Sequence, residues 1–188
     1  MKRMTFLKGL VGAAAIAAIG LPVVAQETIK IGEINHYKRM AAFAGPYKLG
    51  IEMALEEVNA AGGVLGKPME FIFRDDQGKP GEAVKIAEEL MTRDGAVMLT
   101  GTILSNVGLA ISSLAAEKKY VYLASEPLAD AITWSKGNDY TFRLRSSTYM
   151  QAAMLAEEAA KTDAIRYATI APNYAYGKDA VAAFKKAL

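Results

Sequence analysis

Residues Gly50 to Leu90 read GIEMALEEVNAAGGVLGKPMEFIFRDDQGKPGEAVKIAEEL. The first part continues a run of apolar residues at helical spacing that begins at Tyr47, and the glycines after Asn59 end that helix. Met69 to Arg74 (MEFIFR) predicts a strand, and Gly81 to Arg93 predicts a second helix with one apolar face. A helix, a strand and another helix in this order indicate βαβ units.

Strands and helices alternate on both sides of that stretch. Thr28 to Ile34 predicts a strand before it, and Ala96 to Leu99 and Tyr120 to Leu123 predict strands after it. Ser105 or Asn106 can cap the helix between the last two. Such alternation predicts a parallel sheet with helices on both faces and right-handed connections. We therefore expect a three-layer α/β lobe over residues 26–145.

A second, shorter pattern follows residue 145. It predicts a helix capped by Ser146 or Ser147, then a strand at Tyr167 to Ile170, then a helix that runs to Leu188. On the buried side of the first helix we expect Met150, Ala153 and Met154. One strand and two helices bury too little surface to form a core. Residues 146–188 are therefore expected to begin a second α/β lobe that is incomplete at Leu188, with Phe142 to Arg145 as the hinge between the lobes.

The N-terminus has the layout of a secretory signal peptide. Three basic residues and no acidic residue lie in the first 25, an apolar stretch runs from Leu10 to Leu21, and small residues precede Gln26. The apolar core is well short of the roughly 20 residues that cross a bilayer. We expect residues 1–25 to be a cleaved signal peptide. The chain has no cysteine for lipid attachment, so a free periplasmic protein is expected.

Charge and composition exclude several classes of function. The formal net charge is +2. Without the three basic residues of the expected signal peptide, 19 basic and 20 acidic residues remain, which gives a net charge near −1. A nearly neutral body has no broad basic face for nucleic acid. The lack of cysteine excludes disulfides and cysteine-ligated zinc.

Catalytic motifs are also absent from the sequence. No G-x-G-x-x-G follows the first strand, and no G-x-S-x-G is present. His36 is the only histidine, so neither a histidine-rich metal site nor a conventional triad is expected, and a loop histidine is usually exposed to solvent. Asp75 and Asp76 are adjacent on an extended chain and should point to opposite faces, which favours turn formation over paired carboxylates. We expect no enzyme, no cofactor and no metal.

A ligand site is expected beyond the carboxyl ends of the strands. The third strand ends in Thr100-Gly101-Thr102, and Ser105 lies where the next helix begins. Backbone N–H groups, a hydroxyl and the positive end of the helix dipole would suit a carboxylate, with Thr102 and Ser105 as contacts. The alternative is that Ser105 only caps the helix.

The stretch Gly50 to Leu90 resembles the N-terminal lobe of the leucine/isoleucine/valine-binding protein family, the receptors of branched-chain amino-acid-type ABC importers. The resemblance continues through Ser105, Pro127 and the Tyr-Ala-Tyr-Gly of Tyr174 to Gly177. It implies a type I periplasmic binding fold, in which two hinged α/β lobes close on a small solute. Members are about twice as long as the mature chain seen here.

The resemblance also implies roles for single residues. Ser105 matches a serine that holds the ligand carboxylate, and Ser125 matches a threonine at the ligand head group. The carbonyl of Leu123 would accept a hydrogen bond from the ligand ammonium. Phe43 stands where the amino-acid receptors have a tyrosine, and Tyr176 matches a tyrosine that covers the pocket. The acidic residue that neutralises the ammonium would lie beyond the end of the chain.

The identity of the ligand stays open at this point. A branched-chain amino acid is expected first, but Ala131 to Gln151 resembles a subgroup that includes receptors for aromatic carboxylates. In the basic loop after the first strand, Lys38 and Arg39 are either solvated or favour an anion. A monomeric transport receptor that docks on an ABC permease is the main hypothesis. A ligand-sensing module of a receptor or regulator is the alternative from another class.

Overall fold

The computed structural model describes residues 27–188, so the expected signal peptide lies outside the described residues. Within that range, no helix combines the length and the apolar character that a membrane crossing requires. The elements follow the order β1 (Ile29–Asn35), α1 (Ala41–Ala60), β2 (Met69–Asp75), α2 (Pro80–Thr92), β3 (Met98–Gly101), α3 (Ser105–Lys118), β4 (Tyr122–Ala124), the 3-10 helix η1 (Asp130–Ile132), β5 (Thr141–Arg143), α4 (Thr148–Ala159) and α5 (Ala175–Ala187).

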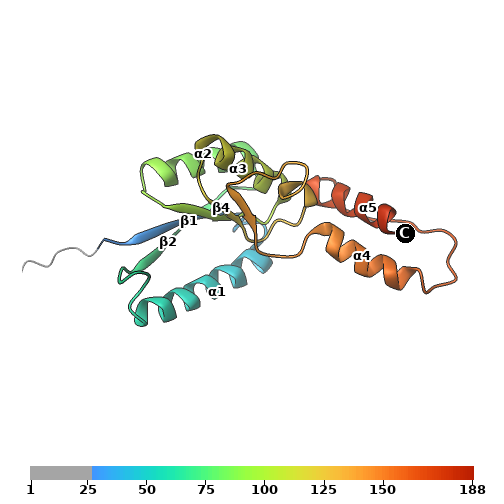
Figure 1. Cartoon of the computed structure of the whole chain (residues 1–188), viewed down its shortest axis with the longest axis horizontal. Helices are drawn as coiled ribbons and strands as arrows, with labels where there is room; N and C mark the ends of the chain where they lie inside the picture. Colours follow the sequence, from blue (N-terminus) through green and yellow to red (C-terminus); the bar gives the residue numbers. More distant parts are fainter. Residues whose placement is uncertain (1–26) are drawn as a thin grey trace, which may run out of the picture.

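The strands form one sheet in the order β2-β1-β3-β4-β5, and all pairs are parallel. Helices α2 and α3 cover one face of this sheet, and α1 lies on the other (Figure 1). The chain runs outward from β1 to β2 and then crosses back to β3, so the winding direction reverses between β1 and β3. The expected three-layer α/β architecture is confirmed.

The hydrophobic core lies mainly between the sheet and helices α2 and α3. The face of α2 that the spacing predicted is buried, and its Leu90 meets Leu99 of β3 and Ile34 of β1 in one cluster. Gly32 of β1 permits this approach, because a Cβ there would lie 2.9 Å from Leu90 Cδ1. The core thus fixes the positions of β1 and β3, the two strands between which the winding direction reverses.

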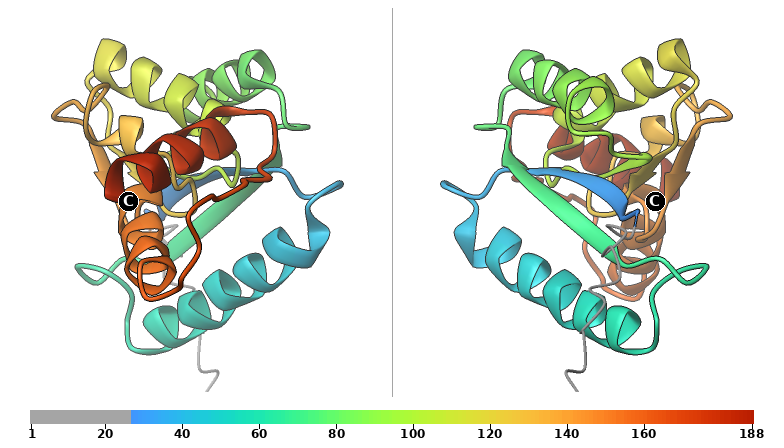
Figure 2. Two further views of the ribbon diagram at one scale, coloured as in Figure 1. Left: turned by 90° about the vertical axis from the view of Figure 1, so that its right-hand side faces the viewer. Right: turned by 90° about the vertical axis from the view of Figure 1, so that its left-hand side faces the viewer.

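The opposite face of the sheet is covered much less closely. Ala44 is the only fully buried residue of α1, and Leu49 and Met53 are exposed on the same helix. Figure 2 shows α1 lying along this side of the sheet as one long helix. The packing between α1 and the sheet is therefore looser than the packing on the other face.

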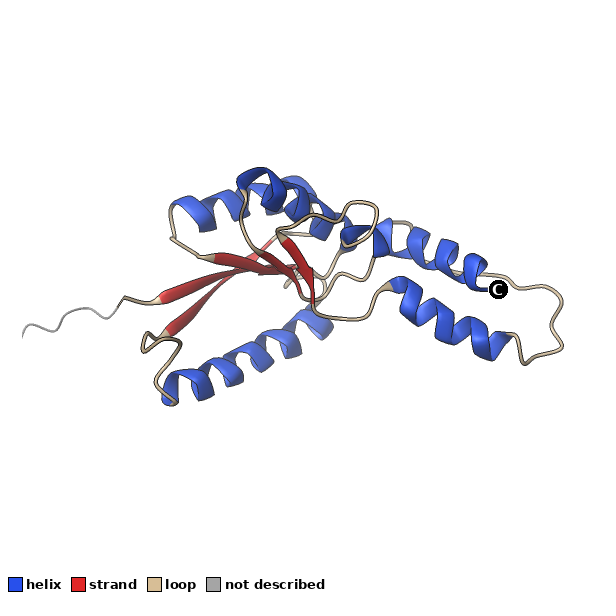
Figure 3. Cartoon of the chain, viewed as in Figure 1, coloured by secondary structure: helices blue, strands red, loops and turns tan. Residues whose placement is uncertain are grey.

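Two expectations for the later part of the chain were wrong. Phe142 and Arg143, expected in a hinge, belong to β5, which pairs with β4 and extends the sheet. Residues 167–170, expected as a strand, form an exposed connection between α4 and α5 (Figure 3), because no strand lies beside them in the described part of the chain. The expected domain boundary near residue 145 falls in the loop between β5 and α4 and stays a prediction.

The first helix after that boundary has a different buried face from the expected one. Ser147 caps α4 as predicted, since its Oγ accepts a hydrogen bond from the Met150 amide at 3.4 Å. Met150 and Met154, however, are exposed, and the small residues Ala152 and Ala156 are buried instead. Helix α4 packs against α5, and small side chains allow two helices to approach closely.

Candidate functional site

The carboxyl ends of β1, β3 and β4 are joined by the side chain of Asn35. Its Oδ1 accepts hydrogen bonds from the amides of His36 (2.9 Å) and Ile103 (3.0 Å), and its Nδ2 donates to Glu33 and Glu126. Asn35 is fully buried, so these bonds satisfy a polar group that water cannot reach. Sequence reasoning missed this residue, although a polar residue closing an apolar strand at the reversal point was a usable signal.

The turn after β3 has an unusual backbone. Gly101 has φ of +105°, and a Cβ there would overlap the carbonyl oxygen of Ile34. Thr102 follows with φ of +63°, a region that β-branched residues rarely adopt. Its amide donates to the Ile34 carbonyl at 2.7 Å, and its hydroxyl shares a hydrogen bond with that of Tyr122. Thr102 is therefore buried, its hydroxyl is engaged by Tyr122, and its expected contact with a ligand stays a prediction.

A cavity of about 260 Å³ opens beside this turn, and we call it the strand-end cavity. Its lining comes from the β1–α1 loop and the start of α1, the β3–α3 turn, the segments after β4 and β5, and the entry of α5. The residues are Met40, Phe43, Ile103, Ser105, Glu126, Leu128, Arg145, Tyr174 and Tyr176. Its volume is slightly below the roughly 300 Å³ at which pockets for drug-sized ligands begin, which suits a small solute.

Three predicted site residues meet in this cavity: Phe43, Ser105 and Tyr176. Ser105 is the first residue of α3, and its neighbour Leu104 occupies the cap position without a side-chain cap. Its hydroxyl oxygen accepts a hydrogen bond from the Ala129 amide at 3.2 Å, which leaves the hydroxyl proton free to donate. Ser105 is therefore not the helix cap, and it lies where the helix dipole favours an anion.

The cavity also holds two opposite charges that the sequence reasoning did not assign to it. Arg145 is exposed at the cavity, and Glu126 is almost buried. Burial raises the pKa of Glu126, while the bond from Asn35 and the charge of Arg145 act in the opposite direction. A cavity with one acid and one base complements a zwitterion.

Three of the residues that line the cavity are aromatic. Phe43 comes from α1, and Tyr174 and Tyr176 come from the start of α5, with their ring centroids 6.0 Å apart. Phe43 is 63% exposed, so its ring is available for contact with a bound molecule. Tyr174 was not predicted, although it is part of the Tyr-Ala-Tyr-Gly motif.

Ser125 and Leu123, also expected at the ligand, line a different cavity. This second cavity measures about 310 Å³, lies between α1 and the sheet, and is almost entirely apolar. The Ser125 hydroxyl is engaged with Tyr47 (2.7 Å) and with the Gly101 amide (3.1 Å), and the Leu123 carbonyl accepts from Thr100 at 3.0 Å. The structure does not bring these two residues to the strand-end cavity.

Behind the cavity lies a buried carboxyl group, Glu33. It accepts hydrogen bonds from Asn35 Nδ2 at 3.2 Å and from the Tyr37 hydroxyl. Burial raises the pKa of Glu33 to about 8; these hydrogen bonds oppose the shift, while Glu126 and Asp76 add to it. Glu33 and Glu126 are joined through one amide group, so Asn35 keeps two carboxyl groups close together.

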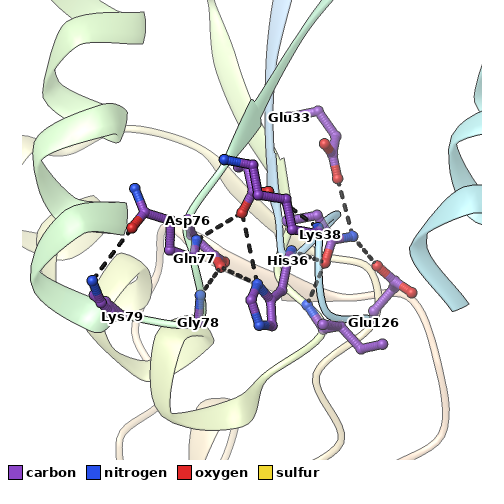
Figure 4. A network of polar contacts seen from close by, with 11 residues as sticks. Glu33, His36, Lys38, Asp76, Gln77, Gly78, Lys79 and Glu126 are labelled. Atoms are coloured by element: carbon purple, nitrogen blue, oxygen red, sulfur yellow. Dashed lines mark hydrogen bonds and ion pairs between the residues drawn. The ribbon is translucent and has the colours of Figure 1, made fainter. Parts of the chain in front are cut away.

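The loops after β1 and β2 hold a second polar group, shown in Figure 4. His36 is 6% exposed, so the expectation of a solvent-facing histidine was wrong. Asp75 and Asp76 form the expected turn, accepting from the amides of Gln77 and Gly78. They nevertheless both face His36, because Asp76 lies past the end of β2, where strand alternation no longer applies. Lys38 and Arg39 are exposed.

A family model of periplasmic binding proteins matches residues 28–188. The chain is 30% identical over 184 residues to Leu/Ile/Val-binding protein homolog 3 of Brucella melitensis, covering 97% of this chain and 50% of that protein. The chain thus spans about half the length of the curated relatives it matches.

Two solved structures share the fold. An ABC-type branched-chain amino acid transporter protein of Rhodopseudomonas palustris is 32% identical, with a TM-score of 0.68. The match covers 85% of this chain and 43% of that protein. A second structure is a solute-binding protein of an ABC transporter from R. palustris in complex with 4-hydroxybenzoate. It is 26% identical, with a TM-score of 0.76, and the match covers 86% of this chain and 43% of that protein. The chain belongs to the branched-chain amino acid family of type I periplasmic binding proteins.

Proposed function

We propose that this chain carries the first lobe of a periplasmic receptor that delivers an amino acid with an apolar side chain to an ABC importer. The observation that carries the proposal is the pair of opposite charges in the strand-end cavity, Glu126 and Arg145. An amino acid at neutral pH carries one ammonium and one carboxylate, and each needs a partner when it leaves water.

Each half of the zwitterion has a candidate partner on this lobe. The Ser105 hydroxyl, the positive end of α3 and the Arg145 guanidinium suit the carboxylate. The Glu126 carboxylate suits the ammonium, which would also lower the pKa that burial raises. Phe43 and Leu128 offer apolar surface for a branched side chain. The function is therefore binding, and not turnover of a substrate.

The transport step is inferred from the family. A solute held on this lobe would be enclosed when a second lobe closes over it, and contacts to both lobes would stabilise the closed state. Tyr174 and Tyr176 approach from the segment that we assign to the second lobe, residues 146–188. The closed receptor would then dock on a membrane permease.

Thermal unfolding of the purified chain with L-leucine tests the proposal. A ligand at ten times its Kd adds about 1.4 kcal/mol of stability, and each further tenfold increase in concentration should add about the same amount again. The variant Glu126→Gln keeps an acceptor for Asn35 but removes the charge, and it should lose the leucine shift. Asp163→Asn, in an exposed loop, is the matched control and should keep it. A leucine shift that survives in Glu126→Gln would contradict the ammonium site.

An aromatic carboxylate is the second candidate, favoured by the three aromatic rings at the cavity and by the 4-hydroxybenzoate bound to the 26% identical relative. Such a ligand has no ammonium group and does not need Glu126. Stabilisation by 4-hydroxybenzoate but not by leucine, unchanged in Glu126→Gln, would establish this candidate and reject the amino acid.

A further inference from the structure

The end of β2 and the loops that follow β1 and β2 bring His36, Asp75 and Asp76 together. The two strands are neighbours with Asn35 opposite Asp75, so the residues just past their ends lie side by side. His36 Nδ1 is 3.6 Å from Asp75 Oδ1 and 3.8 Å from Asp76 Oδ1. One ligand atom from each residue lies within 4.8 Å of the other two. Figure 4 shows the His36 ring directed toward the Asp76 turn.

Two atoms of this group are buried without a hydrogen-bond partner among the described residues: Nδ1 of His36 and Oδ2 of Asp76. His36 is 6% exposed and Asp76 is fully buried. A buried carboxylate oxygen and a buried ring nitrogen are costly to leave unsatisfied. Separations of 3.6 and 3.8 Å are too long for hydrogen bonds between the side chains themselves.

These separations are close to those between two ligands of one metal ion. Donors about 2.05 Å from a tetrahedral zinc ion lie about 3.4 Å apart, so each distance from His36 needs to shorten by only a few tenths of an ångström. The two carboxylates, whose ligand atoms lie within 4.8 Å of each other, would also move toward the ion. Backbone amides already orient the carboxylates: Gln77 (2.8 Å) and Lys38 (3.1 Å) donate to Asp75, and Gly78 (2.6 Å) donates to Asp76. Such outer contacts are what aligned metal ligands require.

We infer that His36, Asp75 and Asp76 form a binding site for a divalent transition-metal cation of the zinc type. One imidazole and two carboxylates favour such a cation over calcium and magnesium, which take oxygen ligands, and over copper(I), which prefers sulfur. Three protein ligands leave a further position for water. The cation would tie the β1–α1 loop to the β2–α2 loop, next to the Asn35 contacts that support the strand-end cavity.

Nuclear magnetic resonance of the imidazole tests the site directly, because His36 is the only histidine in the chain. The purified, tag-free protein is treated with a chelator, dialysed and titrated with zinc chloride. The Nδ1 resonance should shift to a new position that saturates at one equivalent. An Nδ1 signal that does not move with equimolar zinc would overturn the inference, and this readout needs no variant.

Equilibrium dialysis against zinc gives an independent measurement. His36→Gln and Asp76→Asn should each lower the affinity by at least about tenfold, and Asp163→Asn should leave it unchanged. If the two ligand variants, checked by circular dichroism for folding, bind zinc as tightly as the parent, the cation lies elsewhere and the assignment is wrong. Neither experiment depends on the proposed transport role, since no solute is present.

Discussion

Replacing Glu33 with glutamine removes an ionisable group from the interior while keeping its shape. Glu33 is fully buried, and its two oxygens accept from Asn35 and Tyr37. In the variant, the side-chain oxygen can still accept from Asn35, and the amide nitrogen can donate to the Tyr37 oxygen. The exchange therefore changes the charge available to the site more than its packing.

The magnitude follows from the pKa. Burial raises the pKa of Glu33 from 4.5 to about 8, with Glu126 and Asp76 acting in the same direction. Because the folded protein holds this proton more tightly, its contribution to stability is complete below pH 4.5 and is lost as the pH rises through 8. The interval from 4.5 to 7 corresponds to about 3 kcal/mol of unfolding free energy. Residue 33 does not titrate in Glu33→Gln. The free energy of unfolding of the variant should therefore rise by about 3 kcal/mol relative to that of the parent between pH 4.5 and pH 7.

Urea denaturation of parent and variant at pH 4.5, 6, 7 and 8 measures this difference. Other titrating groups are common to both proteins, so the difference between the two curves isolates residue 33. Glu70→Gln, at an exposed position on the neighbouring strand β2, is the control and should run parallel to the parent. A difference between parent and Glu33→Gln that stays constant with pH would refute a raised pKa at Glu33.

Three further substitutions test, by urea denaturation, the backbone turn, hydrogen bonds and helix cap near the strand-end cavity. Gly101→Ala should lower the free energy of unfolding by at least about 2 kcal/mol, because the backbone at residue 101 has a positive φ and the new Cβ would overlap the Ile34 carbonyl. Gly45→Ala is the control: there is open space around residue 45, so this substitution should not destabilise the protein. Arg143→Met should lower the free energy of unfolding by about 3 kcal/mol, because the Arg143 guanidinium donates hydrogen bonds to the Pro127 and Ala129 carbonyls. An unchanged urea midpoint would show that these hydrogen bonds are dispensable. Ser147→Ala should cost about 1 kcal/mol through loss of the α4 cap, and equal loss in the exposed Ser146→Ala would contradict that assignment.

Local patterns in the sequence predicted the elements whose signals lie within a few residues of each other. The apolar period of α2 and the glycines after α1 identified these helices correctly, and alternation of strands and helices identified the parallel sheet. Strand β5 was missed because it has only three residues and its pairing with β4 is not encoded locally. The exposed segment at 167–170 has strand-like residues but no neighbouring strand among the described residues.

The site was predicted in part for the same reason. Ser105 was found because strand ends and helix starts can be located from local signals. Glu126 and Arg145 were missed because their approach depends on how β4, β5 and the first turn of α3 lie together. His36 was misjudged because its burial comes from the register of β1 on β2, and that register places it beside Asp76.

The Asn35 contacts have a consequence for the energetics of capture. One buried amide group holds the end of β1, the turn before α3 and the segment after β4 in place. The conformational entropy of ordering these three segments is therefore lost when the chain folds, and not when a molecule arrives. A preorganised rim of this kind leaves more of each contact energy for affinity, and most of that gain is expected as slower dissociation.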